Sequence, residues 1–591
     1  MGVQREMAKA ETRTEAGSRT GVILAKRICC LLILLGAVVL TLRTTWLVSG
    51  NLYDSDASSE LILGEKLARE GGILSDSFAY STELQVVDLQ LVYKLLFKIT
   101  GSWFQVRFWG AVLMQAMMLG AFAFLARQAR IPFNRFCVAG AAMLLPFSVP
   151  YGRIVLYHNY YSFHVIMANL TLGLYFGAVR RWKGKETLKK PAPWIFGGLL
   201  AAVSYIAGLE GVRQMMVCTA PLMASALLTA LVSEHGRVRE RQNRMKECLP
   251  MLIWALIPLA CSGLGYLTNL GAFAGKYSYT DYSEQYVTLR GVGTLEELFR
   301  NLLITLGFHD QNKLFDLYGV LGICGFLAWL LSLLVAFHTL RNTRDFCARL
   351  LSIFMIMTQL VMCCVFMLLN LDGFRMDLYL LPAIFWIIPA MAKADLRPDS
   401  GTEEEKANAP ERKGLAGLMT RGDAKLSVHG LAGLLVLGML IAGGIYYTGF
   451  FQDPGSYRHV EYSGLNYTDT DNVNGMRPVA DYLVENGYTM VYAPYWQAAV
   501  LTEMTDGQVK SLPVDVGRRK HPIVYYNWLS DLKLQDPAAL EGGKTAILAN
   551  YDLSVELGEG NQYGAEERDT VGGYTVYELP DPAALAKDLA K

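Results

Sequence analysis

Long apolar segments recur along most of the chain, and they set its expected architecture. Segments of about 18 to 25 residues are long enough to cross the hydrocarbon core of a bilayer. Eleven such runs are expected, at about 22–48, 105–127, 132–150, 157–179, 193–210, 214–232, 249–270, 314–338, 347–370, 374–393 and 428–449. The pattern predicts a polytopic α-helical membrane protein with about 11 transmembrane helices.

The charges between these runs are sorted by position. Arg and Lys gather in every second connection, beginning with Arg127, Arg130 and Arg135, while the alternate connections are acidic or mixed. Because cytoplasmic connections carry an excess of Lys and Arg, we expect a cytoplasmic amino terminus and an extracytoplasmic carboxyl terminus. Residues 1–21 are polar and lack apolar periodicity, which predicts a disordered cytoplasmic tail.

The composition supports a membrane protein. Of the 591 residues, 52% are hydrophobic and 18% are charged, which is too apolar for an ordinary soluble domain. The net charge of +1 gives no reason to expect a nucleic-acid partner. The ten cysteines form no CxxC or His/Cys cluster, so neither a disulfide framework nor a cysteine zinc site is indicated. Cysteine-free outer regions and compact loops fit a bacterial plasma membrane.

Two segments after the first run show helical spacing but are too short and too charged to span. They cover 57–70, with Gly71 expected to end the helix, and 86–99. We expect both to lie along the membrane interface as amphipathic helices. A third such helix is expected at 295–306.

The remaining patterns divide the chain into domains. Residues 22–450 form the expected transmembrane domain, and the polar segment 394–426 within it predicts a cytoplasmic linker. Residues 451–591 predict an extracytoplasmic α/β domain that caps the membrane part or binds an acceptor. It has no glycine-rich phosphate loop. Its expected helices are 477–486 and 496–504, and its expected strands are 489–493, 509–514, 545–550 and 574–579.

The segment from Asn51 to Glu60 concentrates three carboxylates directly after the first run: Asp54, Asp56 and Glu60. This concentration favours a reaction centre over a solubilising loop. Alternatively, Asp56 could cap a following helix by accepting from free backbone N–H groups, but capping leaves the other two carboxylates unexplained. Glu83 is a further acidic candidate, with a solvated turn as its alternative reading.

Ionisable residues also stand at the same ends of other expected spans. A charge at mid-bilayer costs roughly 2.5 to 3.5 kcal/mol, so each needs a partner, a wet cavity or a route to the interface. Cations around a carboxylate at headgroup depth suit a lipid phosphate that is held while a group attacks beside it. The candidates are Arg107, Arg153, His158, Glu210, Arg213, Arg375 and Asp377.

In architecture and short motifs the chain resembles the polyprenyl-phosphate-dependent glycosyltransferases of the GT-C superfamily, including the protein mannosyltransferase and aminoarabinose transferase branches. One motif is Asp54-Ser55-Asp56 after the first run. The other is Phe-Arg-Met-Asp-Leu-Tyr-Leu-Leu-Pro at 374–382, which is similar to the family's Arg-Tyr-x-x-Pro segment. The chain departs from the pattern in having Asp-x-Asp for an adjacent Asp-Glu pair, and in the separation of Arg375 from Tyr379.

The resemblance implies a membrane glycosyltransferase that moves a hexosyl or pentosyl group, with inversion, from a polyprenyl-phosphate sugar donor to an extracytoplasmic glycan, lipid or protein. Asp56, or Asp54 as second choice, would take the acceptor's proton. Arg153, Arg213 or Arg375 would meet the charge of the departing phosphate. Asp54 and Asp56 could also hold a divalent cation, Mg or Mn, through oxygen ligands, so metal dependence stays open.

Two other functions fit a polytopic protein. A transporter or lipid-linked glycan flippase is expected to show internal repeats and polar groups at mid-span, whereas here the ionisable residues gather at one face. A non-catalytic membrane protein that binds glycan through its C-terminal domain is the other possibility. Consumption of a polyprenyl-phosphate sugar would distinguish the three.

Overall fold

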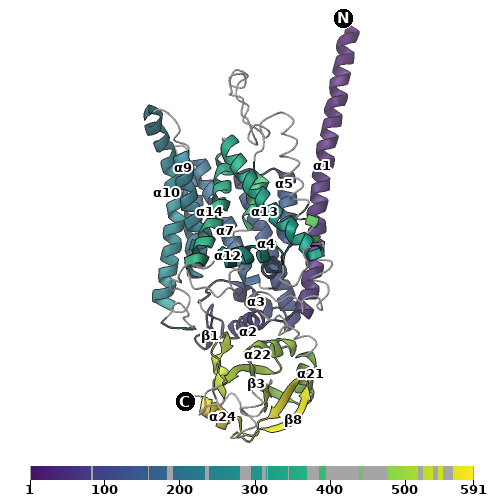
Figure 1. Ribbon diagram of the computed structural model, residues 1–591, viewed down its shortest axis with the longest axis vertical. Coiled ribbons are helices and arrows are strands. Elements are labelled where there is room, and N and C mark those ends of the chain that lie inside the picture. Colours follow the sequence, from purple (N-terminus) through teal and green to yellow (C-terminus); the bar gives the residue numbers. More distant parts are fainter. Residues whose placement is uncertain are drawn as a thin grey trace.

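The protein consists of a helical bundle with a mixed α/β domain at one end (Figure 1). The structure is a computed structural model. It describes residues 2–589 except 82–83, 158, 183–190, 233–237, 274, 280–294, 309–314, 316, 344, 369–384, 395–437, 439, 442, 445–475, 517–522, 537–542 and 550–562.

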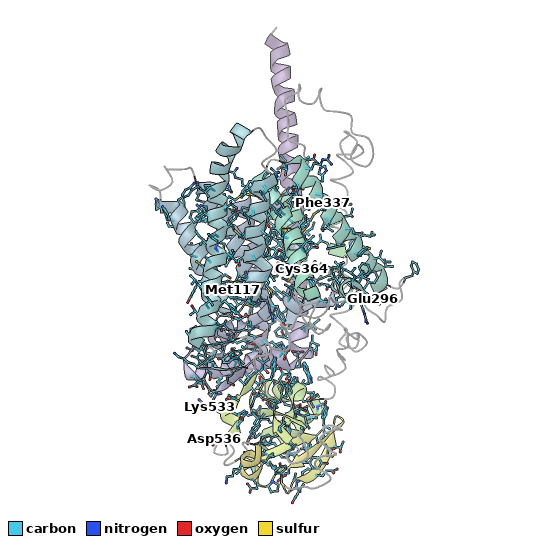
Figure 2. The ribbon with its side chains drawn as sticks, turned by 60° about the vertical axis from the view of Figure 1, so that its left-hand side comes forward. Met117, Glu296, Phe337, Cys364, Lys533 and Asp536 are labelled. Atoms are coloured by element: carbon cyan, nitrogen blue, oxygen red, sulfur yellow. The ribbon has the colours of Figure 1, made fainter. Side chains whose placement is uncertain are left out.

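Seven helices among the described residues are long and apolar enough to cross a membrane. They correspond to seven of the eleven predicted runs, which confirms the fold class at this level. Exposed apolar side chains such as Met117 and Phe337 cover the outside of the bundle, as on a lipid-facing surface (Figure 2). The seven belong to α1 (Gly2–Asn51), α4 (Trp103–Ala129), α7 (Ser162–Arg181), α8 (Pro191–Leu209), α10 (Val238–Thr268), α13 (Leu317–Asn342) and α14 (Phe346–Leu368).

Two further predicted runs form shorter helices. The run at 132–150 gives only α5 (Phe133–Leu144), so the prediction of a full span there is wrong. The helix stops because Pro146 disfavours helical backbone in the residue before it, and Leu145 is extended, with φ −101° and ψ 94°. The run at 214–232 forms η4 (Met215–Thr219) and α9 (Ala220–Val232).

The last two predicted runs lie largely outside the described residues. Of the run at 374–393, the structure describes α16 (Ile387–Lys393) and the two residues before it. The predicted linker at 394–426, apart from Ala394, and nearly all of the run at 428–449 are also outside them.

Three basic residues in or beside the predicted cytoplasmic connections, Arg135, Arg181 and Lys393, lie at one end of the bundle. The guanidinium of Arg135 donates to the backbone oxygen of Ala394 at 2.6 Å, and the Arg181 guanidinium donates to the side chain of Gln128 at 3.1 Å. Lys393 Nζ lies 2.5 Å from a carboxylate oxygen of Asp345. Residues 51–104 and the C-terminal domain meet at the opposite end (Figure 1).

The three predicted amphipathic helices are α2 (Ser55–Glu70), α3 (Leu89–Phe97) and α12 (Leu295–Thr305). Helix α2 is packed between α3 and the C-terminal domain. Its polar residues Ser55 and Ser58 are buried against α22 (Tyr495–Met504) of the C-terminal domain, and Lys66 is buried against Asp531 of the same domain. The helix ends at Gly71, whose φ of 89° favours glycine.

Tyr93 of α3 fixes the spacing of α2, α3 and α4. A Cβ added to Gly64 of α2 would lie 2.5 Å from the Tyr93 Cβ, and one added to Gly110 of α4 would lie 2.3 Å from its ring. No side chain fits at either position without moving the tyrosine. The two glycines thus let α2 and α4 approach α3 closely.

The C-terminal domain is a six-stranded sheet with helices on both faces. The strand order is β5-β4-β3-β7-β9-β8, with β3, β4 and β7 mutually parallel and the other three antiparallel to their neighbours. The buried side chains of α21 and α22 form a core on one face, and those of α24 on the other. The bounds are α21 (Arg477–Glu485), β3 (Tyr488–Pro494), β4 (Lys510–Val516), β5 (Ile523–Tyr525), β7 (Lys544–Ala549), β8 (Glu566–Val571), β9 (Tyr574–Glu578) and α24 (Pro582–Leu589).

This domain is joined to the membrane part by a small three-stranded sheet. Strand β1 (Phe78–Tyr80) lies between β2 (Ser278–Tyr279) and β6 (Ser530–Asp531). It pairs in parallel with β2 and antiparallel with β6. Segments that are far apart in the sequence therefore meet at the end of α2.

Candidate active site

Asp54 and Asp56 stand at the amino end of α2 but make different contacts. Asp54 is the N-cap of α2, because its Oδ1 accepts from the backbone N–H groups of Asp56 and Ala57 at 3.0 and 3.3 Å. The sequence-based alternative assigned this role to Asp56. Asp56 instead accepts a hydrogen bond from the hydroxyl of Tyr495, the first residue of α22. The capping residue and the candidate base are therefore separate residues.

Glu60 lies one helical turn beyond Asp56 and faces the protein interior. Only 5% of it is exposed, and its Oε2 makes no hydrogen bond with the described residues. Burial, and then the negative charge of Asp56, raise the pKa of Glu60 from 4.5 to about 8. Glu60 therefore holds its proton at neutral pH.

Asp88 and Glu210 extend this cluster to α3 and to the turn after α8. Asp88 caps α3 by accepting from the backbone N–H of Leu89 at 2.7 Å. Glu210 accepts from the backbone N–H groups of Val86, at 3.1 Å, and Val87. Burial, followed by the charges of Glu210 and Glu60, raises the pKa of Asp88 well above its ordinary value. The segment before α3 thus brings three buried carboxyl groups together.

Arg213 supplies a cation to the same cluster. Its positive charge favours the ionised form of Asp88, and its guanidinium lies over the ring of Tyr161, 5.4 Å from the centroid. It also acts electrostatically on His164, a buried residue of α7. The structure thus links four residues predicted from the sequence: Asp56 acts on Glu60, and Glu60, Glu210 and Arg213 act on Asp88, which was not predicted.

Several predicted site residues cannot be placed. Arg153 begins the π-helical turn η1 (Arg153–Tyr157), but its side chain is outside the described part of the molecule. Glu83, His158, Arg375, Asp377 and Tyr379 are also outside the described residues.

Arg107 is buried but stands apart from the acidic cluster. Its guanidinium donates to Glu503 of α22 at 2.8 Å, with the two side chains 3% and 2% exposed. Ser58 of α2 donates to the other oxygen of Glu503 at 2.5 Å. Arg107 therefore attaches the C-terminal domain to α4. From the sequence, its charge needed a partner, a wet cavity or a route to the interface, and the structure gives it a partner.

The described residues do not fit a preformed divalent-cation site. No group of three or more His, Cys, Asp or Glu residues among them is arranged to hold a metal ion. Asp54 is engaged by two backbone N–H donors and Asp56 by the hydroxyl of Tyr495. A cation bridging the pair would compete with these hydrogen bonds.

A small cavity lies beside Tyr495 at the junction of α2 and the C-terminal domain. It has room for about one water molecule. The hydroxyls of Ser59 and Ser530 are buried and make no hydrogen bond with the described residues. One of its walls is Leu529, whose φ of 45° is unusual for a residue with a branched side chain. The lining residues include Ser55, Ser59, Tyr495, Ser511, Leu529 and Ser530.

Sequence reasoning missed Asp88, His164 and Tyr495. Asp88 could have been found, because an Asp just before an apolar helical segment is an N-cap signal. His164 is one polar residue in an apolar run and gives no signal of its own. Tyr495 lies 439 residues from Asp56, and no local pattern connects them.

Comparison with known proteins finds likeness in structure but not in sequence. No protein-family model matches the chain, and no curated protein matches it. ArnT from Cupriavidus metallidurans, solved in the apo state, is 11% identical and has a TM-score of 0.48; the match covers 96% of this chain and 99% of that one. An oligosaccharyltransferase from Archaeoglobus fulgidus, tethered with an acceptor peptide, is 12% identical and has a TM-score of 0.44, with 89% and 70% covered.

Both proteins are members of the GT-C superfamily, and ArnT is an aminoarabinose transferase, one of the two branches named above. At such identities and TM-scores, the likeness concerns the overall arrangement of the chain. The roles of individual residues rest on the contacts in this structure.

Proposed function

We propose that this membrane protein is a glycosyltransferase that moves a sugar from a lipid-phosphate donor to a hydroxyl group of an acceptor. One observation carries the proposal: buried acids from α2 and α3 meet Arg213, from the turn after α8, at one end of the bundle. A lipid-linked substrate can enter such a site from the bilayer. The excess of Arg and Lys in the alternate connections favours the extracytoplasmic side for this end.

In the proposed reaction Asp56 is the general base. The acceptor oxygen forms a bond to the anomeric carbon while the bond from that carbon to the phosphate oxygen breaks. The acceptor's proton passes to Asp56, and the electron pair of the broken bond leaves with the phosphate. A single displacement of this kind inverts the anomeric centre.

The neighbouring groups support this division of roles. Burial raises the pKa of Glu60 and of Asp88, so these carboxyls stay protonated to a higher pH than free carboxyls do. Fewer negative charges therefore oppose an incoming phosphate. Carboxyls whose environments separate their pKa values can act as distinct acid and base. Arg213 would attract the phosphate and stabilise the charge that it gains on leaving. Arg153 and Arg375 remain further candidates for this role.

The test is turnover of a radiolabelled polyprenyl-phosphate sugar by the purified full-length protein in lipid vesicles. Asp56→Asn keeps the shape of the side chain but removes its basicity, and we expect release of polyprenyl phosphate to fall by about 10²- to 10⁴-fold. Glu65→Gln is the matched control, because Glu65 lies on the same helix and pairs with Arg69. It should turn over like the wild type.

The alternatives give different results in the same vesicles. A flippase would move the labelled lipid across the bilayer without cleaving it, and a non-catalytic receptor would bind without consuming it. Full activity in Asp56→Asn, with the wild type active, would remove Asp56 as the base.

A further inference from the structure

Tyr495 occupies the position in the C-terminal sheet where α/β folds form their binding sites. It follows Pro494, the last residue of the central parallel strand β3. Strand β4 lies on one side of β3 and β7 on the other, so the strand order reverses there. Ligands of such sheets bind outside the carboxyl ends of the strands at this reversal. Here that position faces the amino end of α2.

Two hydrogen bonds connect this position to the segment that carries Asp56. The Tyr495 hydroxyl donates to Oδ1 of Asp56, and the Ser55 hydroxyl donates to the backbone oxygen of Tyr495 at 2.5 Å. The Tyr495 ring packs against Tyr526, with centroids 5.1 Å apart. Burial, and then the charge of Asp56, raise the pKa of the phenol well above its ordinary value. The hydroxyl is therefore a neutral donor at any physiological pH.

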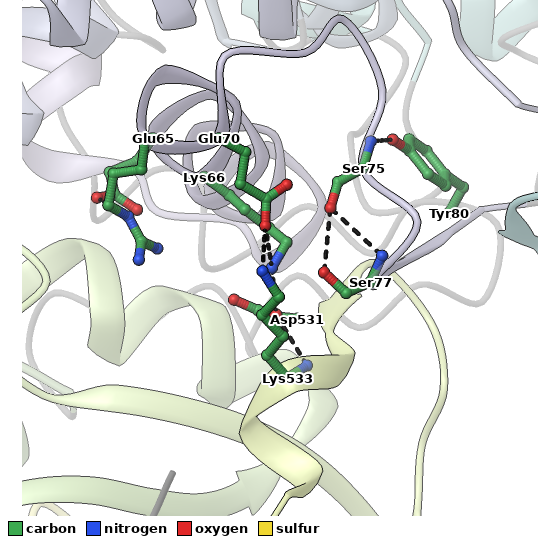
Figure 3. A network of polar contacts seen from close by, with 9 residues as sticks. Glu65, Lys66, Glu70, Ser75, Ser77, Tyr80, Asp531 and Lys533 are labelled. Atoms are coloured by element: carbon green, nitrogen blue, oxygen red, sulfur yellow. Dashed lines mark hydrogen bonds and ion pairs between the residues drawn. The ribbon is translucent and has the colours of Figure 1, made fainter.

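Two buried ion pairs hold Tyr495 in place. Glu503, at the far end of the same helix, accepts from Arg107 at 2.8 Å. On the other side Asp531 accepts from Lys66 Nζ at 2.7 Å, with the lysine side chain 2% exposed (Figure 3). Separating the domain from α2 would remove Glu503 from Arg107 and leave Lys66 with Glu70 of its own helix, and losing the partner of a buried charge is costly. Tyr495 is thus a fixed part of the site rather than a passing contact.

We propose that Tyr495 is a positioning residue for Asp56, through which the C-terminal domain completes the active site. Its hydroxyl fixes the orientation of the carboxylate and stabilises the ionised form that accepts the proton. The inference rests on the proposed function, because it assigns Tyr495 a role in that reaction. It also gives the C-terminal domain a part in the chemical step, in addition to any role in acceptor binding.

The test is Tyr495→Phe in the full-length protein, which removes one oxygen and keeps the ring. Loss of a hydrogen bond to a charged group should lower kcat roughly ten- to a hundredfold. The acceptor KM should change by less than about threefold, since the ring and the domain contacts remain. A hydrogen bond to a carboxylate favours its ionised form, so the acidic limb of the kcat–pH profile should move to higher pH in the variant.

Tyr574→Phe is the matched control. It removes a phenol hydroxyl from the same domain, one that accepts from Gln497 of α22 at 3.0 Å. A merely structural effect of loosening α22 would appear in both variants as a lower melting temperature, without a shift of the pH limb. We expect the shift in Tyr495→Phe alone.

The outcomes separate this inference from the proposed function. If the wild type turns over donor and Asp56→Asn does not, the function stands. Wild-type kcat and an unmoved pH profile in Tyr495→Phe would then overturn the role of Tyr495 alone. A large rise in acceptor KM at constant kcat would also overturn it, because Tyr495 would then be an acceptor contact. A wild type that consumes no lipid-linked sugar removes both proposals.

Discussion

Two sets of buried ionisable groups lie around helix α2, and they differ in their partners. One set consists of pairs of opposite charge, whereas the other is a cluster of carboxyl groups. Toward the C-terminal domain, Lys66 is paired with Asp531, and Glu503 from that domain is paired with Arg107. Toward the bundle, Glu60 is as deeply buried, yet its strongest charged neighbour is another carboxylate, Asp56. The paired charges hold two parts of the molecule together, whereas the environment of the acidic cluster raises the pKa values of Glu60 and Asp88 and favours their protonated forms.

This difference indicates which charges serve structure and which serve chemistry. A protein gains no stability from gathering buried carboxyls whose ionised forms disfavour one another. Perturbed acids of this kind are typical of active sites. The variants below test the contrast, beginning with the largest expected effect.

Glu503→Ala should be the most destabilising change. It leaves Arg107 buried without its carboxylate, and breaking such a pair costs about 3 to 5 kcal/mol. We expect a much lower melting temperature for the C-terminal domain. Tryptophan fluorescence of the protein in detergent measures it. Glu566→Ala, which removes the exposed partner of Arg568, is the control and should melt like the wild type. Equal melting of the two variants would mean that the domain is held by other contacts.

Glu60→Gln should instead make the folded protein more stable. The pKa of Glu60 rises from 4.5 in its ordinary state to about 8 in the folded protein, so the unfolded chain releases this proton at lower pH. The contribution of Glu60 to stability therefore decreases as pH rises from about 4.5 to about 8, and stays low above that range. The amide resembles the protonated acid and does not titrate.

The variant should gain stability over the wild type as pH rises, by at most about 5 kcal/mol at 1.36 kcal/mol per pKa unit. Its turnover at pH 7 should stay within about threefold of wild type, because Glu60 is already neutral there. The measurement is melting temperature at pH 5, 7 and 9. A difference that does not depend on pH would show that Glu60 is ionised in the folded state.

Arg213→Gln should weaken use of the donor. Removing one charge-assisted contact to phosphate should raise the donor KM about tenfold, with a smaller effect on the acceptor KM. Arg181→Gln is a suitable control, because Arg181 lies at the other end of the bundle with Gln128. An unchanged donor KM in Arg213→Gln would leave the phosphate to Arg153 or Arg375.

Arg69→Ala should have the smallest effect. Its pair with Glu65 is 2.6 Å long, but the arginine side chain is 56% exposed, and exposed pairs contribute less than about 1 kcal/mol. The variant should melt within a degree or two of the wild type and remain active. A large loss here would show that exposure is a poor guide to the importance of charges on α2.

Much of the fold could be predicted because the relevant signals are local. Apolar runs located seven long helices, and Gly487, with φ 74°, ends α21 near the predicted position. Strand β8 was missed because its sequence, Glu-Glu-Arg-Asp-Thr-Val, has no apolar alternation. Strands β1 and β6 were missed because each exists only through pairing with a distant segment.

The candidate site could be predicted only in part, for the same reason. The acids beside the first helix and the charges in the turn after α8 are visible as polar residues next to apolar runs. Their partners are not: Arg107 and Glu503 are 396 residues apart, and pairing at that distance has no sequence period. The patterns therefore indicate Arg213 and Glu210, but they give no sign that the C-terminal domain covers α2.

The sheet that joins β1, β2 and β6 has a consequence for how the protein is made. Ribosomes release the segment containing β6 and α22 only after every bundle helix has been synthesised. Until then, Lys66 lacks Asp531, Arg107 lacks Glu503 and Asp56 lacks Tyr495. The contacts that hold α2 to this domain therefore form only after the whole membrane part has been synthesised.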